Sequence, residues 1–405
     1  MRRVLLVLLV GLLAFSAFAV AQERVEIHFL HAMKPYHSVY IDELVNQFMN
    51  EYKYITVTTE YGGSYGDVEQ KINAGIVAGN PATVVQLYEN AITPIVEALV
   101  PIENFLTEDE FNDIIPGLRD SATVNGVLYS VPWNKSIMVL FYRKDLVPEP
   151  PTTWTEFYLM CQELTVDLDE DGNIDRWGTA FRPYNPENFL NYLHQAGGTL
   201  LNADWTEVTV NNDRGFLAMD YAESLVPYAL VGTDYESDMM AANQIAMFIS
   251  TSAGAKYNLE AAETIGTTCG VALAPTGPVA DGTMIQGTNL AVLDVGQTQA
   301  QKDAAVLFIH FMMRPENLAY WCVNSNYLPP TYSSYEDQIW LDAVTSDPLK
   351  ATYAEAMKLG FGPLNHPAYS DFRYHMQTRW EEVIRSARHA QDALDQLAED
   401  FEQYL

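Results

Sequence analysis

The chain has 405 residues, of which 48% are hydrophobic and 19% charged, and its formal net charge at pH 7 is −31. At roughly 100–200 residues per domain, this length predicts two lobes built like an ordinary globular protein. So negative a chain repels nucleic acid and anionic lipid surfaces, and we expect neither as a partner.

The first 21 residues have the pattern of a secretory signal peptide. A basic start at residues 1–3 precedes an apolar run at 4–18, and Ala19, Val20 and Ala21 form a small-x-small cleavage site. The run falls short of the ~20 apolar residues that span a membrane comfortably, and no Cys near the cleavage site offers a lipid anchor. We therefore expect a soluble, monomeric, periplasmic mature protein without membrane insertion.

The three cysteines, Cys161, Cys269 and Cys322, are too few for a disulfide scaffold and fit no metal motif by their spacing. One bridge stays open in an oxidising compartment, but small buried thiols are the favoured interpretation. No cofactor is expected to be required.

In chain order, β-branched and aromatic runs predict strands at residues 25–30, 55–61 and 82–88. Helical spacing at 40–52 and a helix from Asp67, with Asp67 as its cap, separate these strands. The alternation predicts an α/β fold with a parallel sheet covered on both faces.

The rest of the chain continues this alternation. Residues 127–142 predict two strands separated by 132–136, and residues 284–294 another strand. Helices are expected from Trp154, at 219–226, 260–265 and 300–313, and at 377–404 as one long helix or a pair. With no low-complexity linker, several chain crossings are expected to join the lobes.

A hydrolase motif is the first candidate for chemistry. The stretch from Gly62 to Gly66 matches G-x-S-x-G between a strand and a helix, the setting of a serine nucleophile, here Ser64. The strand would lie very early in a hydrolase sheet, and no HGGG-type oxyanion loop is present. A Gly-rich strand–helix turn is therefore favoured, and a secreted serine hydrolase stays an alternative.

An acidic loop resembles the calcium loop of an EF-hand. The carboxylates at its first, third, fifth and ninth positions are Asp167, Asp169, Asp171 and Asp175. Gly172 stands at the sixth position, as in the EF-hand loop. The twelfth position is Gly178 rather than the bidentate Glu, so a structural Ca²⁺ and a plain acidic turn both stay open.

Aromatic residues make up 12% of the chain, and several are expected in loops. Sugar rings stack on aromatic faces while their hydroxyls bond polar side chains. Tyr65, Glu89, Asn134 and Ser136 all follow predicted strands, at the edge where open α/β sheets bind ligands. This pattern predicts a polar small-molecule site.

The order of several segments resembles the extracellular solute-binding proteins of carbohydrate ABC importers, and most of all their glycerol-3-phosphate-binding members. The matching segments are residues 31–33, 63–65, 74–76, 79–82, 86–89, 132–134, 140–142, 151–154, 246–252, 314–317 and 327–329. The resemblance implies a non-enzymatic, two-lobed periplasmic-binding-protein fold with a hinge of crossing strands. It implies a first lobe at 22–135 plus 289–327 and a second at 136–288 plus 328–405.

The resemblance also implies a set of ligand contacts and a partner. The contacts fall on Tyr65, Glu89, Ser136, Tyr184, Ser252, Gly287 and Tyr327. The ligand would be a sugar or polyol, closure of the hinge would hold it, and a membrane permease would receive it. A membrane sensor fed by the loaded protein is an alternative partner.

One departure from the resemblance concerns phosphate. The glycerol-3-phosphate binders have an Arg near residues 364–366, where this chain has none; Arg373 is offset, and Lys135 or Arg182 could substitute. A neutral sugar or a glycerophosphodiester is thus at least as well supported as glycerol-3-phosphate.

Overall fold

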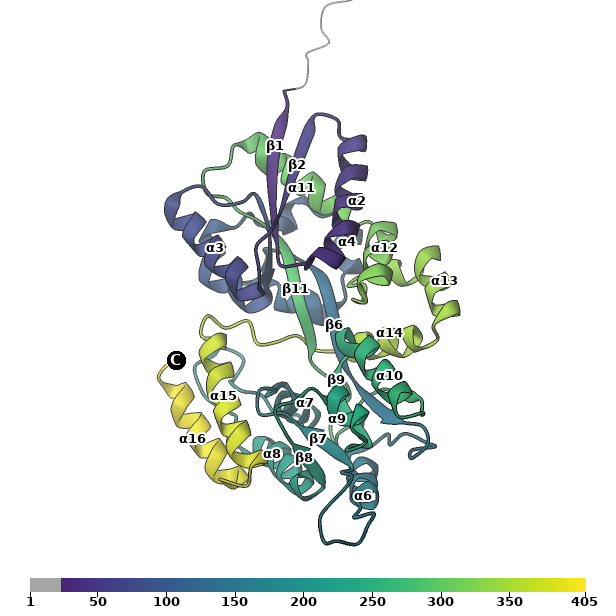
Figure 1. Ribbon diagram of the computed structural model, residues 1–405. Helices are drawn as coiled ribbons and strands as arrows, with labels where there is room; N and C mark the ends of the chain where they lie inside the picture. The colour runs from purple at the N-terminus through teal and green to yellow at the C-terminus, as the bar shows by residue number, and fades with distance from the viewer. Residues whose placement is uncertain (1–22) are drawn as a thin grey trace, which may run out of the picture.

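A computed structural model describes residues 23–405, so the predicted signal peptide at residues 1–21 lies outside the described residues. Figure 1 shows two bodies, one above the other, joined by the strands β6 (Val131–Arg143) and β11 (Ile285–Val292) and by the segment that leads into the C-terminal helices. None of the helices in this described part has the length and apolarity to span a bilayer.

The upper body begins with the predicted alternation of strands and helices. Its elements are β1 (Val25–His31), α2 (Pro35–Glu51), β2 (Ile55–Tyr61), α3 (Tyr65–Ala78) and β3 (Val84–Tyr88). Because Ser64 and Asp67 form a capping box, α3 begins at Tyr65 with Ser64 as its cap, and the prediction of Asp67 as the cap is wrong.

The central sheet is mixed rather than parallel. β1 pairs in parallel with β2 and β3, but β11 runs antiparallel to both β3 and β6. The strand order is β10-β6-β11-β3-β1-β2, with β9 (Met247–Thr251) also on β6 and β10 (Cys269–Ala272) at the far edge. The predicted parallel sheet therefore covers only the first three strands.

β6 is one strand of 13 residues, all buried, where the sequence predicted two runs. Pro132, which lacks a donor, lies opposite Asn289 at the place where the pairing with β11 shifts register. A proline is tolerated at such an irregularity, so it does not end the strand.

Both hydrophobic cores share β6. Successive side chains of a strand point to opposite faces. The odd positions belong to the core that includes the upper body, and the even positions to the core of the lower body: Ile137, Val139 and Phe141 against Met138, Leu140 and Tyr142. The crossing strand is therefore anchored on both faces.

The lower body carries most of the middle of the chain. Its elements are α6 (Trp154–Leu164), β7 (Thr179–Phe181), α7 (Glu187–Gln195), α8 (Asp213–Leu225), β8 (Ala229–Val231), α9 (Glu236–Ala241) and α10 (Ala255–Thr264). The C-terminal stretch, expected at 377–404 as one long helix or a pair, is a pair that begins earlier: α15 (Tyr369–Ile384) and α16 (Ala390–Glu402). These two helices pack on each other and on α8.

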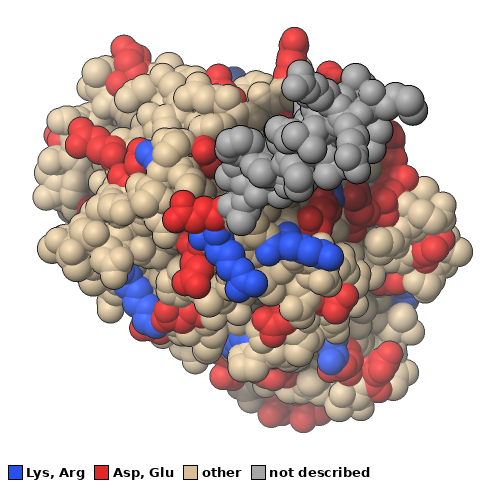
Figure 2. Space-filling model, turned by 90° about the horizontal axis from the view of Figure 1, so that it is seen from above, with Lys and Arg blue, Asp and Glu red and all other residues tan. Residues whose placement is uncertain are grey.

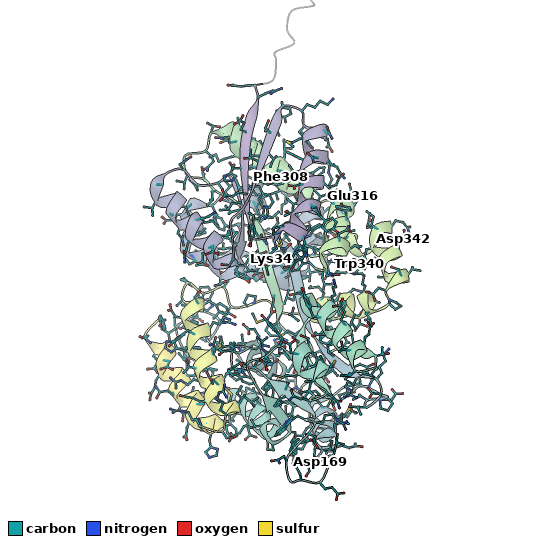
Figure 3. The ribbon with its side chains drawn as sticks, viewed as in Figure 1. Lys34, Asp169, Phe308, Glu316, Trp340 and Asp342 are labelled. Carbon is teal, nitrogen blue, oxygen red and sulfur yellow. The ribbon has the colours of Figure 1, made fainter. Side chains whose placement is uncertain are left out.

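Four α-helices lie between β11 and α15 in the chain. They are α11 (Gln299–Met312), α12 (Pro315–Ser325), α13 (Gln338–Ser346) and α14 (Leu349–Leu359). Figure 3 shows Phe308 of α11 inside the upper body, where its ring lies 5.5 Å from that of Phe29, and Trp340 of α13 at the side. Ser333, which the sequence assigned to the second lobe, bonds through its backbone N–H to Asp113 of the upper body at 2.8 Å. The lobe boundaries themselves stay a prediction.

Short elements complete the described chain. They are η1 (Glu89–Ala91), η2 (Thr93–Ala98), η3 (Ile102–Phe105), α4 (Glu108–Asp113), α5 (Pro116–Ser121), β4 (Thr123–Val124), β5 (Val127–Leu128), η4 (Val226–Tyr228), η5 (Ser252–Gly254) and η6 (Ser333–Tyr335). The three cysteines are free and buried, as favoured from the sequence.

On the face seen from above, the negatively charged side chains are dispersed. Figure 2 shows Asp and Glu side chains in several separate groups on the face seen from above, with fewer Lys and Arg among them. The charged side chains on this face are exposed to solvent, and such a surface favours solubility.

Candidate functional site

A cavity of about 630 Å³ lies where the two bodies meet. The upper body contributes Tyr65 from the start of α3 and Glu89 just after β3. The lower body contributes Tyr184 from the loop after β7 and Arg373 from α15. The crossing strands β6 and β11 form the remaining wall, so side chains from both bodies and from the hinge face one space.

Six of the seven predicted ligand contacts line this cavity: Tyr65, Glu89, Ser136, Tyr184, Gly287 and Tyr327. Ser252 does not; it lines a smaller neighbouring cavity of about 360 Å³, and its Oγ accepts a hydrogen bond from the Ile137 N–H at 3.2 Å. Its neighbours Thr251 and Ala253 line the larger cavity instead. Contact of these residues with a ligand stays a prediction.

Two phenols meet at the upper wall. The hydroxyls of Tyr65 and Tyr327 are 3.1 Å apart, although 262 residues separate them in the chain. Burial raises the pKa of Tyr65 to about 12 and also raises that of Tyr327, so both are neutral at pH 7. One hydroxyl donates its proton to the other in this hydrogen bond, so the accepting hydroxyl can still donate its own proton to a solute.

A buried ion pair lies beneath the cavity. The Lys135 ammonium contacts the Glu89 carboxylate, and their side chains are 0% and 3% exposed. Burial lowers the pKa of Lys135, and the charge of Glu89 opposes that shift. Glu89 lines the cavity and Lys135 does not, so the lining gives no support to Lys135 as the substitute phosphate ligand that the sequence left open beside Arg182.

Gly287 lies opposite Lys135 in the pairing of β11 with β6. Its φ is +133°, a region that side chains rarely adopt, and a Cβ there would overlap the carbonyl oxygen of Asn134. The hinge strands therefore approach closely only because this residue is glycine.

Two arginines enter the cavity from the lower body. Arg373 donates from Nε to Glu187 at 2.7 Å, and Nη1 of Arg182 lies 3.7 Å from Glu236. Burial alone would lower the pKa of Arg373, but Glu187 outweighs it and raises that pKa. From the sequence, Arg182 was a possible substitute for the family's phosphate-binding Arg, and Arg373 was offset from the position of that Arg. Both arginines line the cavity.

Sequence reasoning missed Tyr369 and Glu187, and it did not place Arg373 in the site. Tyr369 and Arg373 are four residues apart on α15 and both line the cavity, so helical spacing offered a signal once one of them was suspected. Nothing local to the sequence pointed to Glu187.

A family model described as bacterial extracellular solute-binding protein matches residues 43–352. The chain belongs to this family. Its matched region holds the hinge strands and most of the cavity residues.

This solute-binding protein has curated relatives and solved neighbours of similar length. It is 26% identical over 355 residues to the sn-glycerol-3-phosphate-binding periplasmic protein UgpB of Escherichia coli (strain UTI89 / UPEC), an alignment covering 80% of this chain and 78% of the relative. The cyclic alpha-maltosyl-1,6-maltose binding protein from Arthrobacter globiformis superposes with a TM-score of 0.82 at 20% identity, covering 94% and 99% of the two chains. UgpB from Mycobacterium tuberculosis in complex with glycerophosphocholine gives 0.77 at 18%, covering 94% and 98%.

These matches confirm the two-lobed α/β fold and the resemblance to extracellular solute-binding proteins. The family is one of binding proteins rather than enzymes. In this solute-binding protein the suspected nucleophile Ser64 caps α3: its Oγ donates to Asp67 at 2.7 Å and accepts from the Asp67 N–H at 3.2 Å. The G-x-S-x-G stretch is therefore a helix-capping turn.

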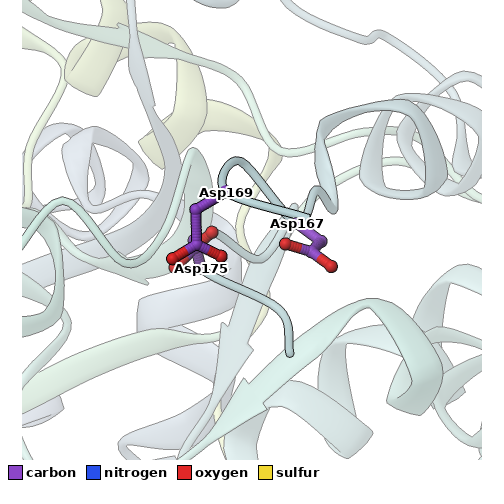
Figure 4. A group of neighbouring side chains, drawn as sticks. All are labelled: Asp167, Asp169 and Asp175. Carbon is purple, nitrogen blue, oxygen red and sulfur yellow. The ribbon is translucent and has the colours of Figure 1, made fainter. Parts of the chain in front are cut away.

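The acidic loop of this solute-binding protein lies far from the cavity. Figure 3 shows Asp169 at the lower tip of the second body. Figure 4 shows that Asp169 and Asp175 lie together with Asp167 nearby; one carboxylate oxygen from each lies within 4.8 Å of the others. Asp171 is outside this group, and its Oδ1 accepts from the Asn173 N–H at 2.8 Å.

The last position of this loop differs from an EF-hand for a structural reason. A Cβ on Gly178 would overlap the backbone of Cys161, so the fold leaves no room there for the bidentate Glu. Calcium binding by the three clustered carboxylates stays a prediction from the sequence.

Proposed function

We propose that this protein is the periplasmic solute-binding component of an ABC importer for a carbohydrate, a glycerophosphate or a related polyol. The observation that carries the proposal is the cavity lined by both bodies and by the two strands between them. Such a site holds a solute by contacts that exist together only when the bodies are close.

The binding step follows from this arrangement. Tyr65 and Glu89 belong to the upper body, whereas Tyr184 and Arg373 belong to the lower one. A solute that contacts both bodies binds the closed form more tightly than the open form, so it shifts the equilibrium toward closure. The hinge strands absorb the motion, as in other periplasmic binding proteins.

Delivery then needs a membrane partner. The loaded, monomeric protein docks on the permease of the importer and releases its solute chemically unchanged. Export through a cleaved signal peptide at residues 1–21 places it in the periplasm for this task. Support for this step comes from the family and from the likeness to the E. coli glycerol-3-phosphate-binding protein.

A thermal-shift panel tests the proposal. Saccharides, glycerol-3-phosphate and glycerophosphocholine are added one at a time to the mature protein, and each is re-examined chemically after incubation. A bound solute at a hundredfold excess over Kd stabilises the folded state by about 2.7 kcal/mol and is recovered intact. Hydrolysis of an ester in the panel, lost in Ser64→Ala, would instead support a hydrolase.

A further inference from the structure

Every charged side chain of the cavity has a counter-charge beside it. Three carboxylates, whose side chains are 3%, 8% and 6% exposed, each hold one cation: Glu89 with Lys135, Glu187 with Arg373, and Glu236 with Arg182. Three cations and three carboxylates sum to no net charge. Transfer of a proton within a pair would leave that sum unchanged.

We infer that the site selects solutes without net charge and rejects phosphomonoesters such as glycerol-3-phosphate. This inference rests on the proposed function and narrows its substrate class. It separates the chain from its E. coli relatives, whose name states that they bind glycerol-3-phosphate.

A phosphomonoester would lose hydration without meeting a free cation. Its doubly charged group would have to share Arg373 with Glu187, whose Oε1 lies 2.7 Å from Nε of that arginine. A buried charge without a dedicated partner is costly, and the −31 charge of the chain adds long-range repulsion. The pairs therefore oppose an anion at close range, and the net charge of the chain opposes it at long range.

An uncharged hydroxyl meets no such obstacle. Arg373 uses Nε toward Glu187 and Nη2 toward the Tyr184 carbonyl at 3.4 Å, and a guanidinium has five N–H groups. The hydroxyl of Tyr369, a residue only 4% exposed on the cavity wall, has no hydrogen-bond partner among the described residues. A polyhydroxylated solute would satisfy both groups.

The cavity has room for a solute larger than glycerol-3-phosphate. A volume of about 630 Å³ corresponds to roughly twenty waters at ~30 Å³ each. Saccharides and zwitterionic glycerophosphodiesters both combine this size with hydroxyl groups and no net charge.

Competing solutes and two charge variants test the inference. Binding of saccharides of increasing length, glycerophosphocholine and glycerol-3-phosphate to the mature protein is measured by calorimetry at neutral pH and low salt. Glu187→Gln and Glu236→Gln, which free Arg373 and Arg182 respectively, are measured in parallel. Glu51→Gln, which frees Arg314 where neither residue lines the cavity, controls for the change in total charge.

The expected result is tighter binding of a net-neutral solute than of glycerol-3-phosphate by the unmodified protein. Glu187→Gln or Glu236→Gln should then strengthen glycerol-3-phosphate binding roughly tenfold or more, and Glu51→Gln should not. Which neutral class binds shows whether the solute is a saccharide or a diester. The second variant keeps the test decisive if one fails to fold.

Three outcomes overturn the inference. Glycerol-3-phosphate binding as tight as that of any neutral solute does so while leaving the importer role intact. Folded charge variants with no gain in glycerol-3-phosphate binding show that the ion pairs do not set the selectivity. Absence of binding by every solute and every variant removes both the inference and the proposed function.

Discussion

The Lys135 ammonium contacts the Glu89 carboxylate with side-chain exposures of 0% and 3%, at the point where β6 passes between the bodies. Breaking a buried pair from one side leaves an uncompensated charge and costs about 3–5 kcal/mol. We therefore expect Glu89→Gln to lower the free energy of unfolding by about that amount in urea titrations. Adding Lys135→Met should restore most of the stability but not solute binding.

The control for this pair lies on the surface. Glu355 pairs with Lys358 at 2.8 Å, with side chains 62% and 44% exposed, and Glu355→Gln should cost about 1 kcal/mol or less. Equal urea midpoints for Glu89→Gln and Glu355→Gln would show that the buried pair is not ionised.

Gly287 predicts a backbone effect at the hinge. Gly287→Ala places a Cβ against the Asn134 carbonyl at a φ of +133°, so we expect a loss of about 3 kcal/mol or more in unfolding free energy. Gly126→Ala is the matched control, because Gly126 also has a positive φ of +78° but a Cβ there would meet no atom within 4 Å. Only the backbone strain of about 1 kcal/mol therefore remains. Similar losses in both variants would mean that the hinge strands separate easily.

His31 predicts a pH dependence of stability. Burial lowers its pKa from 6.5 to about 4, against a smaller opposing effect of Glu60, and its Nδ1 accepts a hydrogen bond from the Met33 N–H at 3.1 Å. As the pH falls, the unfolded chain takes up this proton first. The contribution of neutral His31 is therefore complete above pH 6.5 and is lost between pH 6.5 and 4, by about 3 kcal/mol.

His31→Asn measures this contribution because it keeps a polar side chain that does not titrate. Chemical unfolding at several pH values should show a shallower loss of stability between pH 6.5 and 4 than in the unmodified protein. His389→Asn, at an exposed histidine that bonds Glu223 at 2.7 Å, should retain the full loss over that interval. The assignment to His31 fails if the two variants have the same pH profile.

The acidic loop predicts a calcium effect on melting. At 10–100 times a Kd of about 10⁻⁴–10⁻³ M, Ca²⁺ would stabilise the folded state by about 1.4–2.7 kcal/mol. Asp169→Asn should abolish the rise in melting temperature, and EDTA should reverse it. Asp171→Asn, outside the cluster, should change it less; an unchanged melting temperature with millimolar calcium leaves only an acidic turn.

Local patterns in the sequence were sufficient for much of the upper body. The strand and helix periodicities from Val25 to Tyr88 predicted β1 to β3 and the helices between them, because those periodicities arise within single elements. They failed at β6, where Pro132 suggested a break. Only the irregular pairing with β11 shows why the strand continues.

The residues of the candidate site also divide into those that the sequence predicted and those that only the structure places. The sequence placed Tyr65 and Glu89 beside strand ends, and its likeness to a family suggested Tyr327, all of which line the cavity. That likeness also suggested Ser252, which lines the smaller neighbouring cavity instead and whose hydroxyl accepts a hydrogen bond from the crossing strand.

By itself, the sequence determined the alternation of strands and helices in the upper body and the kind of solute-binding family, and it predicts an export signal. Each of these features depends on residues that are close along the chain or on the order of segments in the chain. Only the tertiary structure decided the charge of the site, because Arg373 meets Glu187 across 186 residues and Lys135 meets Glu89 across 46. Such pairings depend on how α7 and α15, or β6 and η1, pack together, and no local periodicity encodes that packing.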